Sequence, residues 1–154
     1  MRRLFSRNGH TRTTGRNDCS PKNLKAICIH QKWGYTDSHG KILIFPQFEW
    51  ASDFSGELAR VKIKGKCGCI NPKGEYAIRP KFDWIGVFSE GVAYVRQGAY
   101  FGYIDSNGVY VIPPKFDYAM DFFCGIAYVE KGTFHGYIDH SGTPLFRQEE
   151  ELGV

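Results

Sequence analysis

Three carboxylates at one recurring position are the first residues in this chain that could do chemistry. Glu49, Asp83 and Asp117 are spaced 34 residues apart. A pair of carboxylates can serve as general acid and base in bond cleavage. Because each of the three follows a phenylalanine in the same local pattern, we interpret them as residues that cap or solvate identical turns.

Cysteine and histidine supply the other reactive groups, with five residues of each. Cys67 and Cys69 resemble part of a metal site, yet zinc takes about four ligands and its cysteine pairs are separated by two to four residues. In the recurring pattern both stand where other units have aromatic residues or histidine, so we expect them to be packing residues. No histidine has a recurring cysteine or carboxylate partner, and the sequence contains no phosphate loop or nucleophile elbow. We therefore expect no catalytic residue, no cofactor and no metal site.

One recurring position has the residue types of a binding surface. Trp50, Trp84 and Tyr118 each follow one of the three carboxylates, again 34 residues apart. We call these three residues the aromatic ladder. Flat amphipathic rings at equivalent positions could stack a carbohydrate or a peptide. The other interpretation is that the rings pack in the core or between units.

The elements that must position these residues are repeated units. Two series of glycines recur every 34 residues. The first is Gly34, Gly68, Gly102 and Gly136, and the second is Gly40, Gly74, Gly108 and Gly142. A fixed period of this kind identifies a repeat protein. One unit alone would bury too little apolar surface, so several units must stack to be stable.

Each unit contains a turn that opens with Asp or Asn and closes with a glycine of the second series. Asp37-Ser38-His39-Gly40 and Asp105-Ser106-Asn107-Gly108 are examples. The pattern is typical of a type I turn whose last residue is left-handed, in a hairpin with a G1 bulge. We therefore predict positive φ angles at Gly40, Gly74, Gly108 and Gly142.

Runs of β-branched and aromatic residues flank the turns and predict antiparallel strands. Phe101-Gly102-Tyr103-Ile104 precedes a turn and Tyr110-Val111-Ile112 follows it. The predicted fold class is all-β, with tandem 34-residue units of three antiparallel strands and a bridging segment, stacked in series. A partial β-propeller-like arrangement is the alternative, although propeller blades have four strands and about 40–50 residues.

The composition is that of a folded, turn-rich β protein. Of 154 residues, 42% are hydrophobic, 16% are aromatic and 18 are glycine. No apolar run approaches the roughly 18 residues of a membrane-spanning helix. The formal charge is +4, but residues 1–16 hold five arginines and no acid, which leaves 15 basic and 16 acidic side chains elsewhere. A nearly neutral repeat region argues against a nucleic-acid surface.

These observations divide the chain into three parts. We expect a flexible basic leader over residues 1–23, a β-repeat domain of about three and a half units over residues 24–148, and a short tail over residues 149–154. The leader lacks the apolar core of a secretory signal, and an odd number of cysteines suits free thiols in a reducing compartment. We therefore expect a cytoplasmic protein.

The repeated residues resemble the WG-repeat family, a β repeat common in bacterial proteins. The likeness rests on Lys32-Trp33-Gly34-Tyr35, on Phe101-Gly102-Tyr103-Ile104-Asp105 with Pro113-Pro114, and on Phe88-Ser89-Glu90-Gly91-Val92-Ala93. It extends over about residues 24–146. The tryptophan of the motif is kept only at Trp33, and Cys67, Phe101 and His135 replace it. The resemblance implies a non-enzymatic scaffold or interaction module, with no catalytic residues to transfer.

Two functions follow from these expectations. The first is a non-enzymatic β-repeat scaffold that binds protein. The alternative is a binder of glycan or another extended polymer through the aromatic ladder. Exposed rings in a line would favour the polymer binder, and buried rings would favour the scaffold.

Overall fold

Residues 24–145 are the part of the chain that the computed structural model describes, and they form fourteen β-strands in four sheets. The first sheet contains β1 (Lys25–Ile29), β2 (Lys32–Thr36) and β3 (Ile42–Phe48). The second contains β4 (Trp50–Ala51), β5 (Ala59–Ile63), β6 (Lys66–Ile70) and β7 (Tyr76–Phe82). The third contains β8 (Trp84–Ile85), β9 (Val92–Gln97), β10 (Tyr100–Asp105) and β11 (Tyr110–Phe116). The fourth contains β12 (Tyr118–Ala119), β13 (Ala127–Lys131) and β14 (Phe134–Ile138).

Every sheet is an antiparallel meander in which strands that follow one another along the chain pair with each other. The predicted all-β fold of tandem antiparallel units is confirmed. The complete units differ from the prediction in one respect, because the bridging segment also forms a strand, β4, β8 or β12, of two residues. The second and third sheets therefore have four strands. The predicted leader (residues 1–23) and tail (residues 149–154) lie outside the described residues, and none of the described residues form a helix suited to crossing a membrane.

The turns have the predicted conformation. Asp105 Oδ1 accepts hydrogen bonds from the backbone N–H groups of Asn107 and Val109, both at 2.9 Å. The N–H of Gly108 donates to the carbonyl oxygen of Asp105 at 3.0 Å. The closing glycines have positive φ angles, as predicted: 82° at Gly40, 83° at Gly74, 78° at Gly108 and 80° at Gly142. Glycine adopts this conformation without a Cβ clash.

The other glycine series allows close approach of two strands. Between the pairs Phe101–Phe116 and Tyr103–Ile112, one residue of β10 lies opposite three residues of β11, so β11 is bulged there. A Cβ on Gly102 would lie 2.5 Å from the carbonyl oxygen of Ile112. A Cβ on Gly34 would lie 2.4 Å from the carbonyl oxygen of Ile44, and a Cβ on Gly68 would lie 2.4 Å from that of Ile78. The bulge therefore requires glycine on the facing strand.

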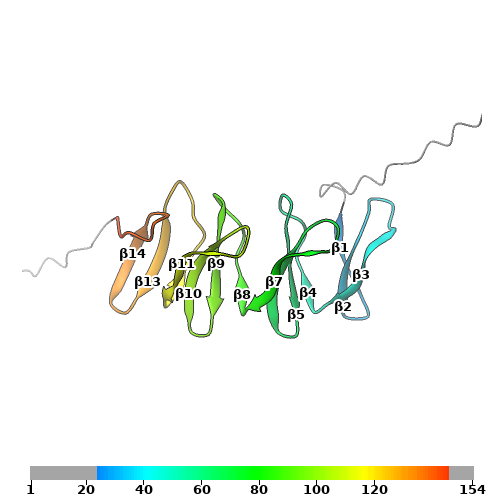
Figure 1. Ribbon diagram of the computed structural model, residues 1–154, viewed down its shortest axis with the longest axis horizontal. Coiled ribbons are helices and arrows are strands. Elements are labelled where there is room, and N and C mark those ends of the chain that lie inside the picture. Colours follow the sequence, from blue (N-terminus) through cyan, green and yellow to red (C-terminus); the bar gives the residue numbers. More distant parts are fainter. Residues whose placement is uncertain (1–23, 146–154) are drawn as a thin grey trace, which may run out of the picture.

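The hydrophobic core lies between successive sheets. Three clusters of buried residues fill the three gaps, and each cluster takes side chains from both neighbouring sheets. The middle cluster, for example, includes Ile78 and Phe82 of the second sheet with Ile85 and Val95 of the third. The four sheets follow one another along the long axis of the molecule (Figure 1), which is the predicted series arrangement.

Two repeated contacts link neighbouring sheets. The closing glycine of a turn packs against an isoleucine of the preceding sheet, so a Cβ on Gly108 would lie 2.9 Å from Ile78 Cγ2. The Tyr103 hydroxyl donates to the carbonyl oxygen of Met120, directly after β12 of the next sheet, at 2.8 Å. Tyr35 and Ser52 make the equivalent bond at 2.8 Å. The aromatic ladder is thus carried by a stack whose units repeat the same contacts.

Candidate binding cleft on the aromatic ladder

The aromatic ladder lies on the short first strands of three successive sheets. Trp50 begins β4, Trp84 begins β8 and Tyr118 begins β12. Trp50 is half-buried, while Trp84 is 37% exposed and Tyr118 is 45% exposed. None of the three belongs to the core clusters of the described residues. The ladder is therefore a surface feature.

The acidic residue before each ladder position fixes a hairpin turn. Asp83 Oδ2 accepts a hydrogen bond from the Gly98 N–H at 2.7 Å, and Asp117 Oδ2 accepts one from Gly132 at 2.7 Å. Glu49 Oε2 accepts from the Gly65 N–H at 3.1 Å. The interpretation of these carboxylates as turn caps is confirmed.

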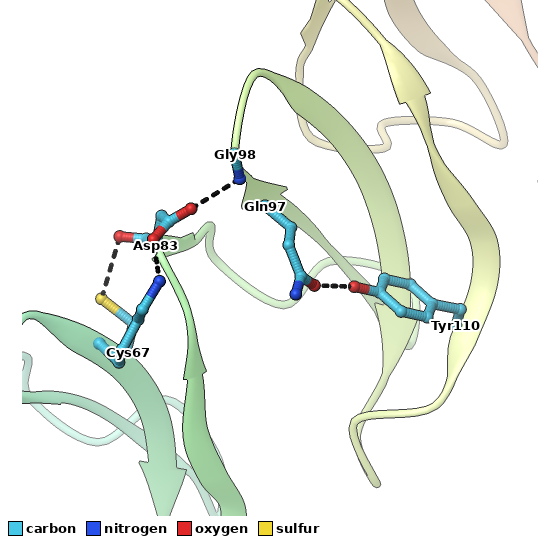
Figure 2. Close-up of polar contacts among 6 residues, drawn as sticks. Cys67, Asp83, Gln97, Gly98 and Tyr110 are labelled. Atoms are coloured by element: carbon cyan, nitrogen blue, oxygen red, sulfur yellow. Dashed lines mark hydrogen bonds and ion pairs between the residues drawn. The ribbon is translucent and has the colours of Figure 1, made fainter.

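Asp83 has a second partner that links two sheets. Figure 2 shows the Asp83 carboxylate bonded to the Gly98 N–H. Asp83 Oδ1 also pairs with Lys66 Nζ of the second sheet at 2.5 Å. The bond from Lys66 and then the bond from Gly98 hold the pKa of Asp83 below its usual range. Asp83 therefore stays ionised at neutral pH.

Five aromatic rings form a continuous chain of contacts across three sheets. Trp50 and Trp84 have ring centroids 5.7 Å apart, and Trp84 Nε1 donates to the Tyr94 hydroxyl at 3.3 Å. Tyr94 lies 6.2 Å from Phe101, which lies 6.1 Å from Tyr118. These spacings are within the range of favourable aromatic pairs. The structure therefore brings all three ladder residues together, with Tyr94 and Phe101 added.

The last four of these rings line an open cleft of about 330 Å³, to which the second, third and fourth sheets all contribute residues. We call it the aromatic cleft. Its lining is Trp84, Tyr94, Phe101 and Tyr118 together with Lys62, Asp83, Arg96 and Ala119. The volume is at the lower end of the range of small-ligand sites. A lining of aromatic rings and charged side chains suits a ligand with flat apolar faces and polar edges.

Strand register places a charged residue beside each ladder ring. Trp50 lies opposite Lys62, and Trp84 lies opposite Arg96. Residues directly opposite in an antiparallel pair have side chains on the same face of the sheet. Near Trp50, the Arg60 guanidinium also lies 5.5 Å from the ring centroid, a cation–π distance. The first two rings are therefore in a positively charged setting.

Cys67 and Cys69, which resemble part of a metal site, are packing residues, as predicted. Cys67 and Cys69 are both buried in the middle core cluster. Burial raises the pKa of Cys67, and it raises the pKa of Cys69 to about 12. Within residues 24–145, no group of three or more His, Cys, Asp or Glu side chains could hold a metal ion.

Comparison with known families identifies the repeat. The pattern described as "WG containing repeat" matches three consecutive segments, residues 33–67, 68–100 and 101–132. The chain belongs to the WG-repeat family. The matched segments begin at Trp33 and end just after β13, so this WG-repeat domain includes every ladder residue and the whole aromatic cleft.

Other comparisons add little about this WG-repeat domain. No curated protein matches the sequence. Among solved structures, a plant lectin with two metal-binding sites from Cicer arietinum is similar at 15% sequence identity. The likeness covers 86% of this chain and 87% of the lectin chain, with a TM-score of 0.35. A superposition this loose carries no argument about function.

Two rings of the aromatic cleft, Tyr94 and Phe101, were not predicted from the sequence. Phe101 stands at the tryptophan position of the WG motif, and Tyr94 recurs as Tyr128 one unit later. Both residues occupy positions that recur in the repeat, but their place beside the ladder depends on how the strands pair. Arg96 of β9 is paired with Trp84 on one side and with Phe101 on the other, which sets these residues in one row.

Proposed function

We propose that this WG-repeat domain is a non-enzymatic binding module that takes an extended partner on the aromatic cleft. The observation that carries the proposal is the chain of five aromatic residues linked by ring pairs and one hydrogen bond, with Trp84 and Tyr118 partly exposed. The rings come from three stacked sheets, so a ligand that follows them must be extended. Stacked repeats commonly bind extended partners in this way.

The non-enzymatic part of the proposal is supported by how the reactive groups are held. Asp83, the carboxylate in the cleft, is engaged by Lys66 and by a turn N–H. The raised pKa values of Cys67 and Cys69 keep both thiols protonated, and a protonated thiol is a poor nucleophile. These residues serve the fold rather than a reaction.

A glycan or another extended polymer is the partner class that ring exposure supports. Core packing would have hidden the ladder, whereas Trp84 and Tyr118 retain exposed surface in a row. A protein partner is the second candidate, and the residue types support it. Trp, Tyr and Arg are the side chains that most often dominate binding energy at protein interfaces.

The experiment compares the wild type with Trp84→Ala and Phe45→Ala on immobilised polysaccharides and on immobilised candidate proteins. Phe45 lies on β3, outside the cleft, and is 76% exposed, so its removal is a matched loss of a surface ring. We expect Trp84→Ala to weaken binding on the order of tenfold or more. Phe45→Ala should bind as the wild type does. Equal binding by both variants would refute the cleft as the partner site.

A cytoplasmic location remains a prediction of the same proposal. Its support is that Cys28, Cys67, Cys69 and Cys124 are free thiols, as expected in a reducing compartment. Cell fractionation tests it directly. Recovery of the protein outside the cytoplasm would overturn the location without affecting the binding site.

A further inference from the structure

Two cations at the aromatic cleft have no ion-pair partner within residues 24–145. The ion pairs in that range join Lys66 to Asp83, His135 to Glu130 and His140 to Glu90. Lys62 and Arg96 line the cleft and take part in none of them. Their charges are therefore available to a ligand.

The carboxylate in the cleft, Asp83, is engaged more strongly by Lys66 and by the Gly98 N–H than by Arg96, whose charge is the smallest of the causes that lower its pKa. Asp83 is neutralised by its short ion pair with Lys66, and its other oxygen is bonded to a turn N–H. Lys62 and Arg96 each stand opposite a ladder tryptophan, whereas Tyr118 stands opposite Glu130. The excess positive charge is thus concentrated beside Trp50 and Trp84.

We propose that the partner is an acidic polysaccharide, whose sugar rings stack on Trp84 and Tyr118 and whose anionic groups pair with Lys62 and Arg96. This inference rests on the proposed function, because it assumes that the cleft is the binding site. A sugar ring has an apolar C–H face that can lie on an aromatic ring and a polar edge that can reach the charged side chains of the cleft. Guanidinium and ammonium groups form charge-assisted hydrogen bonds with carboxylates and sulfates.

An acidic peptide fits the same surface less well. Peptides commonly bind by extending a sheet edge or by filling an apolar groove. One edge of the third sheet is β8, which has only two residues, and the other is β11, which is bulged and contains Pro113 and Pro114. Short, bulged or proline-containing edges resist strand addition. What the surface does offer is exposed ring faces, which need no backbone pairing.

The test uses pairs of polysaccharides that share a backbone and differ chiefly in charge, together with one acidic polypeptide. Polygalacturonate is compared with its methyl ester, dextran sulfate with dextran, and polyglutamate represents an acidic peptide. Each probe is titrated against the wild type, Lys62→Gln, Arg96→Gln and Trp84→Ala. Lys25→Gln is the matched control, since Lys25 is an exposed cation on β1 outside the cleft.

We expect at least one acidic polysaccharide to bind more tightly than its uncharged counterpart and than polyglutamate. Lys62→Gln and Arg96→Gln should each weaken that binding by about two- to fivefold, as for exposed ion pairs. Added salt should weaken it as well, and Lys25→Gln should leave it unchanged.

The contradicting outcomes separate this inference from the proposed function. Trp84-dependent binding that is equal for charged and uncharged glycans would overturn the acidic partner and leave the binding module intact. Tighter binding of polyglutamate would overturn the glycan class in favour of an acidic peptide. The absence of Trp84-dependent binding to every probe would overturn the inference together with the polymer-binding function.

Discussion

Glycines without room for a Cβ determine how each unit is built. Gly102→Ala would place a methyl group 2.5 Å from the Ile112 carbonyl oxygen, so β10 and β11 would have to separate. We expect a loss of about 3 kcal/mol or more in the free energy of unfolding. Urea denaturation measures it.

Gly98→Ala is the control for this substitution. Gly98 has a φ of 63°, but a Cβ there would meet nothing within 4 Å. Its replacement should therefore show only the left-handed backbone penalty, about 1 kcal/mol. Similar losses at Gly98 and Gly102 would contradict the close-approach explanation.

Turn aspartates should make the domain sensitive to acid. The pKa values of Asp37 and Asp105 lie below the usual range. The largest cause for Asp37 is the hydrogen bond from the Lys41 N–H, and for Asp105 it is the bond from the Val109 N–H. Because the folded-state pKa lies below the unfolded-state value of about 4, each contributes stability that is present above that value. This stability is lost as the pH falls through the folded-state pKa.

Asp105→Asn tests this dependence with a residue that the repeat already uses. Asn71 occupies the same turn position, where its Oδ1 accepts the equivalent bonds from Lys73 and Glu75 without titrating. The variant should therefore lose less stability than the wild type in thermal melts from about pH 6 to pH 2. An unchanged pH dependence would show that this turn does not contribute.

The residues whose roles were predicted correctly from the sequence are those whose conformation depends on their neighbours in the chain. The left-handed turn glycines follow from the residues of a single turn, and the capping carboxylates follow from their recurring place. Lys62, Arg96, Tyr94 and Phe101 were not identified as cleft residues. Their role depends on the register of β5, β8, β9 and β10, which pairs residues that are distant in sequence.

At the scale of the element, the strand that sequence analysis missed is the one that carries the ladder. β4, β8 and β12 have two residues each, too few to show the alternation that identifies a strand. Their short length leaves each ladder ring at the start of a sheet edge, where it retains exposed surface. The bridging segment is thus both a strand and the support of the aromatic ladder.

The packing of a turn on the preceding sheet gives a prediction at this scale. In Gly108→Ala the new methyl group would lie 2.9 Å from Ile78 Cγ2 of the second sheet, whereas in Gly40→Ala it would meet nothing within 4 Å. Both variants share the left-handed penalty. We expect Gly108→Ala to lose about 1–2 kcal/mol more than Gly40→Ala, because only it crowds an interface between sheets.

Chemical denaturation of the two turn variants provides the measurement. A larger loss for Gly108→Ala would support the turn-to-sheet contact as a link between units. Equal losses would mean that the interface relaxes freely around the added methyl group.

At the scale of the whole molecule, stacking converts one position of the repeat into a row of rings. The residue at the tryptophan position of the WG motif differs along the row. It is Cys67 in the second sheet, where Trp50 and Trp84 are in direct contact, and Phe101 in the third, where Trp84 and Tyr118 line an open cleft. The 34-residue period of the sequence therefore predicts the stacking of sheets in series. The cleft depends instead on positions where the units differ from one another.

The most direct test of the account is Trp84→Ala, with polysaccharide binding and stability measured on the same preparation. Because Trp84 is 37% exposed and lies outside the core clusters, we expect a stability loss of about 1–2 kcal/mol, below the 3–5 kcal/mol of a buried aromatic residue. Binding should fall on the order of tenfold or more. A loss of 3–5 kcal/mol in stability with unchanged binding would show that Trp84 is a packing residue and would contradict the binding-module account.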